Sequence, residues 1–225
     1  MMSDLVRHTV RRVLSSQPLA SDRERCIALH DFVRNEIRFG FTADFETVTP
    51  EQTLQSKKGH CNAQGDLFCA LLGEAGISAR LRFVQIEKQI LRHAVPEPIY
   101  YILPPTLFHA VTQVNLSDRW FNTDSYLFDI DRFQRQKEKL IHSGLPCGFG
   151  LSGNATCYWD GSSDAFAQAY SGVLTPQDQI FPSLRTACDA RAGNNTLFGI
   201  HFNTWLSWIP SPLRNVWEQY ANSRL

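Results

Sequence analysis

The chain has 225 residues with 22 basic and 22 acidic side chains, and therefore a formal net charge of zero. A chain of this length can form one substantial domain that buries roughly 70% of its unfolded surface. An apolar fraction of 43% with 20% charged residues is typical of a globular protein. The balanced charge excludes the single-sign field of a nucleic-acid-binding protein, so we expect no nucleic-acid partner.

The N-terminal residues 1–16 mix apolar and arginine side chains and lack the apolar core of a signal peptide. No stretch approaches the roughly 18 apolar residues of a membrane-spanning helix. We therefore expect a cytoplasmic protein without a membrane partner, whose cysteines stay reduced. The cysteines form no CxxC pair and no histidine-rich cluster at zinc spacing, so we expect neither a metal site nor a cofactor.

The first half of the chain predicts helices with clear start signals. Residues 20–37 carry apolar side chains at helical spacing, with Ser21 as the cap and Glu24 in the capping-box position. Thr49-Pro50-Glu51-Gln52 predicts a second, short helix. Gly59 then permits a sharp turn into a helix that begins at Cys61 and ends at Gly76.

From Ile77 onward the apolar period changes from helix to strand. Residues 77–83 alternate apolar and polar side chains, which is typical of a half-buried strand. A proline-punctuated irregular stretch follows, and then residues 107–116 and 119–124 predict two strands joined by a Ser117-Asp118 turn. Residues 131–142 predict another helix. Helices segregated from an antiparallel sheet predict an α+β architecture.

Three residues in this order suggest a thiol nucleophile with an oriented base: Cys61, His109 and Asp124. Cys61 opens a helix, where the backbone N–H groups and the helix dipole favour a thiolate. A two-residue turn would place Leu116 opposite Arg119 and Val111 opposite Asp124. His109 would then share a face with Asp124 as its diagonal neighbour, within reach of its side chain. A register slip of one residue would separate them.

The residues that carry these motifs resemble the transglutaminase-like superfamily. Gly59-His60-Cys61 with the downstream Ala75-Gly76-Ile77-Ser78-Ala79-Arg80 is similar to its nucleophile segment. Phe108-His109-Ala110-Val111 resembles its histidine strand, although that family often has an aromatic residue in place of Val111. Trp120 with Asp124 resembles its aspartate strand. The resemblance covers roughly residues 25–127.

The resemblance implies a papain-like α+β core with Cys61 as nucleophile, His109 as base and Asp124 as the residue that orients the histidine. The backbone N–H of Cys61 is one candidate oxyanion donor. By analogy with papain-like proteases, Gln55 is a candidate second donor, and the alternative is that Gln55 merely ends a surface helix. We expect residues 1–144 to form the catalytic core. Residues 145–225, rich in tryptophan near the end, are expected to pack on this core as an extension rather than a separate domain.

The sequence therefore predicts a cysteine hydrolase of the protease or amidase type, which acts on a peptide or carboxamide bond through a thioester. Acyl transfer to an amine, as in transglutaminases proper, is the first alternative. Hydrolysis is favoured by analogy, since the chain is small and lacks the extra β-domains of the crosslinking members. A binding module that keeps the fold without catalysis is the second alternative.

Overall fold

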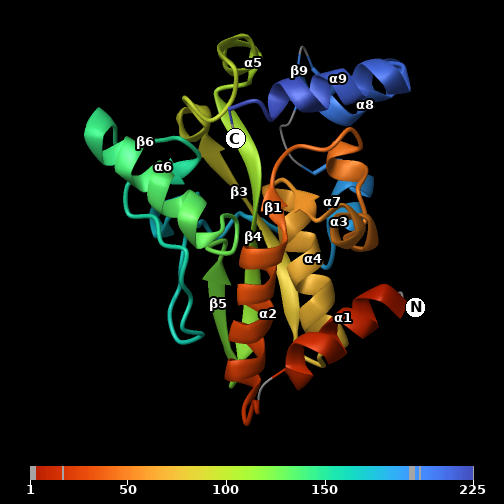
Figure 1. Cartoon of the computed structure of the whole chain (residues 1–225), viewed down its shortest axis with the longest axis vertical. Coiled ribbons are helices and arrows are strands. Elements are labelled where there is room, and N and C mark those ends of the chain that lie inside the picture. Colours follow the sequence, from red (N-terminus) through yellow and green to blue (C-terminus); the bar gives the residue numbers. More distant parts are fainter. Residues whose placement is uncertain (1–3, 17, 193–195, 198, 225) are drawn as a thin grey trace.

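The computed structural model describes residues 4–16, 18–192, 196–197 and 199–224. Its centre is an antiparallel sheet with the strand order β5-β4-β3-β8. Strands β3, β4 and β5 of this sheet are labelled at the centre of Figure 1. The strands of this sheet are β3 (Ala79–Glu87), β4 (Thr106–Leu116), β5 (Arg119–Thr123) and β8 (Gln179–Phe181). Helix α4 (Cys61–Glu74) packs on β3 and β4, and helices α1 (Asp4–Ser15) and α2 (Asp22–Glu36) pack on α4. The predicted α+β class is confirmed.

The remaining elements surround this core. They are β1 (Arg38–Phe39), the 3-10 turn η1 (Phe45–Thr47), α3 (Pro50–Ser56), β2 (Lys58–Gly59), η2 (Lys88–Leu91), α5 (Glu97–Ile102), α6 (Ile130–Ser143), β6 (Cys147–Gly148), β7 (Leu151–Ser152), η3 (Ser171–Val173), α7 (Leu184–Asp189), β9 (Thr196–Leu197), β10 (Ile200–His201), α8 (Phe202–Trp208) and α9 (Ser211–Ala221). Within the described ranges, none of the helices combines the length and apolarity of a membrane-crossing segment.

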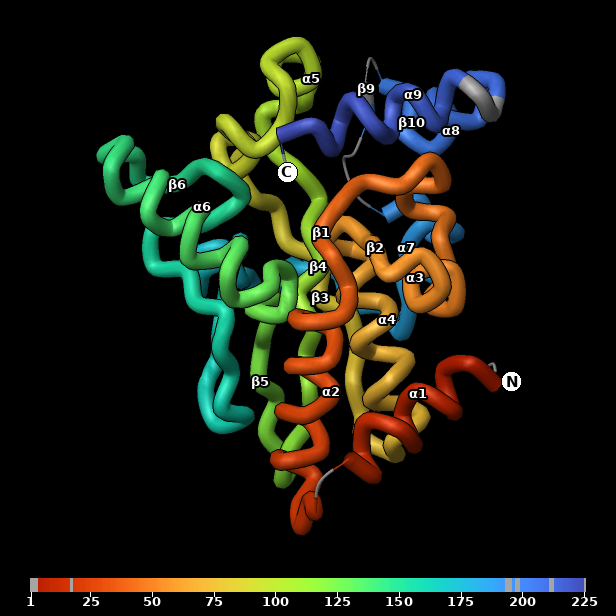
Figure 2. Tube along the Cα trace, in the orientation of Figure 1, coloured from red at the N-terminus to blue at the C-terminus, as the bar shows by residue number. Residues whose placement is uncertain are grey.

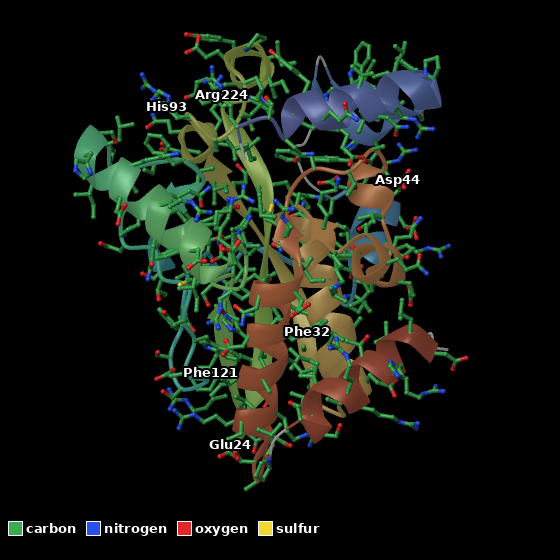
Figure 3. All side chains as sticks on the ribbon, viewed as in Figure 1. Glu24, Phe32, Asp44, His93, Phe121 and Arg224 are labelled. Atoms are coloured by element: carbon green, nitrogen blue, oxygen red, sulfur yellow. The ribbon has the colours of Figure 1, made fainter. Side chains whose placement is uncertain are left out.

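Both predicted capping boxes are present. The Ser21 hydroxyl accepts a hydrogen bond from the N–H of Glu24, and the N–H of Ser21 donates to the Glu24 carboxylate, which starts α2. Thr49 and Gln52 form the same reciprocal pair at the start of α3. Each box satisfies two of the N–H groups that a helix leaves unpaired at its start. These helix starts are therefore fixed by local chemistry. Glu24 marks the lower end of α2 in Figure 3.

The β4–β5 hairpin has the predicted register. Ser117 and Asp118 form the turn with φ of 51° and 62°, and two consecutive left-handed residues are the signature of the tight turn that matches strand twist. Leu116 pairs with Arg119, and the ladder continues to Thr112 opposite Thr123. The strand then leaves β4, because the N–H of Asp124 donates to the carbonyl of Ala165 instead. Asp124 thus lies at the end of β5, opposite the His109 half of β4.

Two elements differ from the sequence predictions. Helix α5 lies in the proline-punctuated stretch that was expected to be irregular, since Pro98 stands in the first turn of the helix, where its missing N–H costs nothing. Strand β8 pairs with β3 although it comes from the C-terminal third. It has three residues and no alternation of buried and exposed side chains, so it carried no strand signal.

The C-terminal helices are fastened to residues 40–58. The side-chain amide of Asn222 exchanges two hydrogen bonds of 2.8 Å with the backbone N–H and carbonyl of Phe41. Glu218 accepts from the N–H of Ala43 at 2.8 Å and pairs with Lys58. Figure 2 shows the two segments side by side, and Asp44 in Figure 3 lies beneath α9. We call residues 199–224 the C-terminal clasp.

Helix α4 lies close to the sheet at Gly65. A Cβ atom at this position would stand 3.1 Å from the Tyr126 hydroxyl oxygen and 3.2 Å from a Leu81 methyl group. Tyr126 and Leu81 are fully buried and have no room to move. Because Gly65 is four residues after Cys61, this close approach sets how near the helix start comes to β4.

We expect Gly65→Ala to lower the free energy of unfolding by about 1 kcal/mol, since overpacking a core costs roughly 1–3 kcal/mol and exceeds the helix-propensity gain of about 1 kcal/mol. Gly73→Ala is the matched control, because Gly73 is exposed in the same helix. That variant should gain up to about 1 kcal/mol. Urea unfolding of both variants tests this, and equal stabilisation would show that Gly65 is not a packing constraint.

Candidate active site

Cys61 is the first residue of α4, with His60 in the N-cap position and Gly59 in β2 immediately before. The thiol is partly exposed, and the N–H groups of a first helical turn have no partner within the helix. A developing negative charge at this position is therefore stabilised by the helix start. The predicted nucleophile has the position that its chemistry requires.

His109 lies in β4 and is completely buried. Its Nε2 forms a hydrogen bond of 2.7 Å with Oδ2 of Asp124. The structure thus brings together the predicted base and its predicted partner. Nδ1 has no hydrogen-bond partner of ordinary geometry in the part of the chain that is described, and both His109 and Cys61 line one cavity.

The pKa of His109 reflects these neighbours. Burial lowers it, but the negative charge of Cys61 and the hydrogen bond to Asp124 outweigh burial and raise the pKa to about 10. The site therefore stabilises the protonated imidazole beside the thiol, as general-base activation of a cysteine requires.

The Asp124 carboxylate is held by the backbone of a distant segment. It accepts hydrogen bonds from the N–H groups of Ala167, Gln168 and Ala169, the last at 2.8 Å to Oδ2. With His109, these donors satisfy a carboxylate that is fully buried. Sequence reasoning missed these donors, because a backbone N–H carries no sequence signal and residues 167–169 are more than forty positions away.

Asn62 was also missed. Its Nδ2 donates to the Glu46 carboxylate at 3.0 Å and to the Phe108 carbonyl at 3.3 Å, and its Oδ1 accepts from the N–H of Ala110 at 2.8 Å. The side chain thus binds β4 on both sides of His109. It ties the residue after the nucleophile to the strand of the base. The only sequence signal was a polar residue directly after Cys61.

The structure does not bring Gln55 to the site. Gln55 is exposed on α3 and does not line the cavity that contains Cys61. The helix ends one residue later, and Lys57 adopts a left-handed conformation that redirects the chain into β2. Gln55 therefore lies near the end of a surface helix, as the alternative to an oxyanion donor predicted.

Beside Cys61 is a cavity of about 280 Å³. Its polar side chains, His60, Asn62, His109 and Gln168, belong to the surroundings of Cys61 and Asp124. The rest of the lining apart from Cys61 is aliphatic or aromatic and comes from residues 39–45, the end of β3, residues 90–95, residues 99–103, the start of β4, and the clasp. Among the described residues no group of three or more histidine, cysteine or acidic side chains is arranged to hold a metal ion.

Comparison with known proteins identifies the family. The sequence model of the transglutaminase-like superfamily matches residues 7–125, which is more than half of the chain, so the protein belongs to this superfamily. Members of the superfamily are in general enzymes of the cysteine-protease kind. The fold described above is accordingly the papain-like, transglutaminase-like α+β core.

Among solved structures, the chain is similar to a protein from Cytophaga hutchinsonii named a "Putative Cysteine Protease". The two share 16% identity with a TM-score of 0.40, over 54% of this chain and 38% of the other. The chain thus spans well under half of that protein. No curated protein matches the chain.

We expect iodoacetamide at neutral pH to label Cys61 far faster than the other five cysteines. Burial raises the pKa of Cys26 and of Cys188 to about 12, and it also raises the pKa values of Cys69, Cys147 and Cys157. Their thiolate fractions are therefore very small. Peptide mass spectrometry of a labelling time course measures all six rates.

The variant His109→Ala should slow the labelling of Cys61 by about tenfold or more, because the base that stabilises the thiolate is gone. A Cys61→Ser variant gives the background rate of the other thiols. Similar labelling of all six cysteines, or an unchanged Cys61 rate in His109→Ala, would remove the pair from the mechanism.

Proposed function

We propose that the protein is a cysteine hydrolase in which Cys61 is the nucleophile, His109 the general base and Asp124 the residue that orients the histidine. The observation that supports this most strongly is the 2.7 Å bond from His109 Nε2 to Asp124, which leaves Nδ1 as the ring nitrogen available to Cys61, whose charge and hydrogen bond both raise the pKa of His109. This is the order of contacts that a thiol triad requires.

The chemistry follows from this arrangement. His109 takes the proton of Cys61 through Nδ1, and the thiolate attacks the carbonyl carbon of the substrate. The oxyanion that forms faces the first-turn N–H groups of α4, including that of Cys61. Collapse of this intermediate expels the leaving group, which takes the proton from His109, and leaves a thioester on Cys61. Water activated by His109 then attacks the thioester and releases the acid.

The cavity favours hydrolysis over transfer to a lysine side chain. The lining residues around Cys61 include no acidic side chain, so an ammonium group that approached the thioester there would lose its hydration without a counter-charge. Water carries no such cost. The substrate bond in this proposal is a peptide, a carboxamide or a related acyl bond.

The partition of the acyl-enzyme tests this choice. With p-nitrophenyl acetate, we expect an initial burst of p-nitrophenol and an acetyl group on Cys61, detectable by mass spectrometry. Added lysine amide should not speed the loss of the acetyl group, whereas hydroxylamine, a small neutral nucleophile, should. If acetyl-lysine amide is the main product, the protein is an acyltransferase. If the Cys61→Ala variant shows the same turnover, Cys61 is not the nucleophile, and if neither protein exceeds the uncatalysed rate, the protein is a binding module.

We expect Asp124→Asn to lower kcat/KM by about ten- to a thousandfold, equivalent to roughly 1.4–4 kcal/mol. The loss should be smaller than the factor of about 10⁴ in serine enzymes, because a cysteine ionises more readily. The variant should also be less stable by about 1–3 kcal/mol, since an amide NH2 would face the backbone N–H donors of residues 167–169. Activity assays well below the melting temperature separate the two effects. Near-normal activity with lowered stability would assign Asp124 a structural role only.

A further inference from the structure

The cavity beside Cys61 is polar at one end and apolar throughout the remainder. The polar end consists of His60, Asn62, His109 and Gln168 next to the thiol. Beyond it, the walls are formed by side chains such as Phe41, Ile90, Ile99, Leu103, Trp205 and Trp217. No lysine, arginine, aspartate or glutamate is among the lining residues. A ligand in this space must therefore place its polar atoms near Cys61.

This distribution argues against a peptide chain in the cavity. Each residue of a peptide carries a backbone N–H and C=O that need partners once they leave water. Apart from the indole N–H groups of Trp205 and Trp217, the side chains of these walls offer no such partners, so a buried peptide segment would lose most of its hydrogen bonds to water without replacement. An alkyl chain has no polar groups and gains from burial against the same walls.

His60 supplies a second observation that points to a ligand. Its side chain is 2% exposed and lines the cavity, and neither ring nitrogen has a hydrogen-bond partner within the described ranges. The ring lies flat against Phe45, with centroids 4.6 Å apart. Burial, together with the charge of His109, lowers its pKa to about 3, so it is neutral. A neutral imidazole has one donor and one acceptor, and buried polar groups of this kind are nearly always paired.

We infer that the cavity holds the aliphatic acyl chain of the substrate, with its carbonyl at Cys61 and its ester or amide group within reach of His60. The inference rests on the proposed function, since it names the substrate class of the same site. The chain stays in the cavity after the leaving group departs, which holds the thioester in place for the attack of water. The cavity of about 280 Å³ is of the size that small-molecule ligands occupy, and we take an acyl chain of roughly eight to ten carbons as the occupant to test.

The reaction is balanced without another reagent. The Sγ–C bond forms, the bond from the carbonyl carbon to the leaving oxygen or nitrogen breaks, and the His109 proton goes to the leaving group. Water then forms the new C–O bond as the C–S bond breaks. The products are a medium-chain fatty acid and an alcohol or amine.

A series of p-nitrophenyl esters from acetate to tetradecanoate tests the inference. We expect kcat/KM to rise about two- to fourfold per methylene up to the octanoate or decanoate, because each buried methylene is worth up to about 0.8 kcal/mol. It should fall for the tetradecanoate. The variant Ile99→Trp, which narrows the cavity, should move the optimum to shorter chains. Tyr101→Trp is the matched control, since Tyr101 lies on the same helix but is 73% exposed and outside the lining.

His60 is tested by a pair of variants. His60→Phe keeps the stacking on Phe45 but removes the hydrogen-bonding groups, and it should lower kcat/KM by roughly ten- to a hundredfold at every chain length. His60→Gln restores a donor and should recover part of this loss. Equal activity of His60→Phe and the unaltered protein would remove His60 from the proposal.

These experiments distinguish failure of the acyl-chain inference from failure of the proposed hydrolase function. A flat chain-length profile with turnover that depends on Cys61 overturns the acyl-chain inference and leaves the hydrolase. A preference that follows the alcohol, measured with octyl acetate against ethyl acetate, places the chain on the leaving-group side and also overturns it. If no ester is turned over through Cys61, the proposed function fails.

If no ester is turned over, the acyl-chain inference is tested separately by ligand binding. The Cys61→Ala variant is titrated with octanamide and with acetamide, and the tryptophan fluorescence of the protein, to which Trp205 and Trp217 of the cavity contribute, is recorded. Octanamide binding that is at least tenfold tighter and is weakened by Ile99→Trp supports the acyl-chain cavity. Equal or absent binding overturns it.

Discussion

The buried carboxylate of Asp124 is the constraint on which the site depends. An ion removed from water must find hydrogen-bond donors or it destabilises the fold by several kcal/mol. Here the donors are His109 from the neighbouring strand and the backbone N–H groups of residues 167–169. A single charge therefore fixes the end of β5, the imidazole orientation and the path of a segment that lies outside the region matched by the family.

A second set of hydrogen bonds, made by the Asn62 side chain, holds the strand that carries His109. Asn62 binds the backbone of Phe108 and Ala110, so the start of α4 and the middle of β4 are held together. The close approach at Gly65 has the same effect one helical turn later. The nucleophile and the base thus come from rigid elements joined on both sides of the reacting atoms. Such preorganisation reduces the entropy that must be lost on reaching the transition state.

The parts of the molecule that were predictable from sequence are those decided locally. Ser21 and Thr49 start helices through hydrogen bonds within four residues. The Ser117-Asp118 turn sets the register of the hairpin as far as Thr112 opposite Thr123, which brings Asp124 near His109. The residue types at helix starts and turns, and the spacing of apolar residues, are enough to predict these helices and this hairpin.

The remaining features depend on contacts between distant segments. Gln55 was chosen by analogy of spacing, but the left-handed turn at Lys57 separates it from Cys61. The N–H donors of residues 167–169 reach Asp124, and β8 pairs with β3 at the edge of the sheet, only when the C-terminal third folds back. The apolar cavity is likewise invisible in the sequence, because its walls come from several separate regions whose side chains look like ordinary core residues.

The C-terminal clasp has a consequence for how specificity could evolve in this protein. The atoms that perform the chemistry belong to α4, β4 and β5, whereas Trp205, Leu206 and Trp217 of the clasp shape the space beside them. The clasp is joined to residues 40–58 by the polar contacts of Asn222 and Glu218 rather than by a sheet. Substitutions there can alter the shape of the cavity without disturbing the nucleophile. Reactivity and substrate selectivity thus depend on different segments of the chain. Replacing the clasp with another sequence would change which substrates bind while the reaction stays the same.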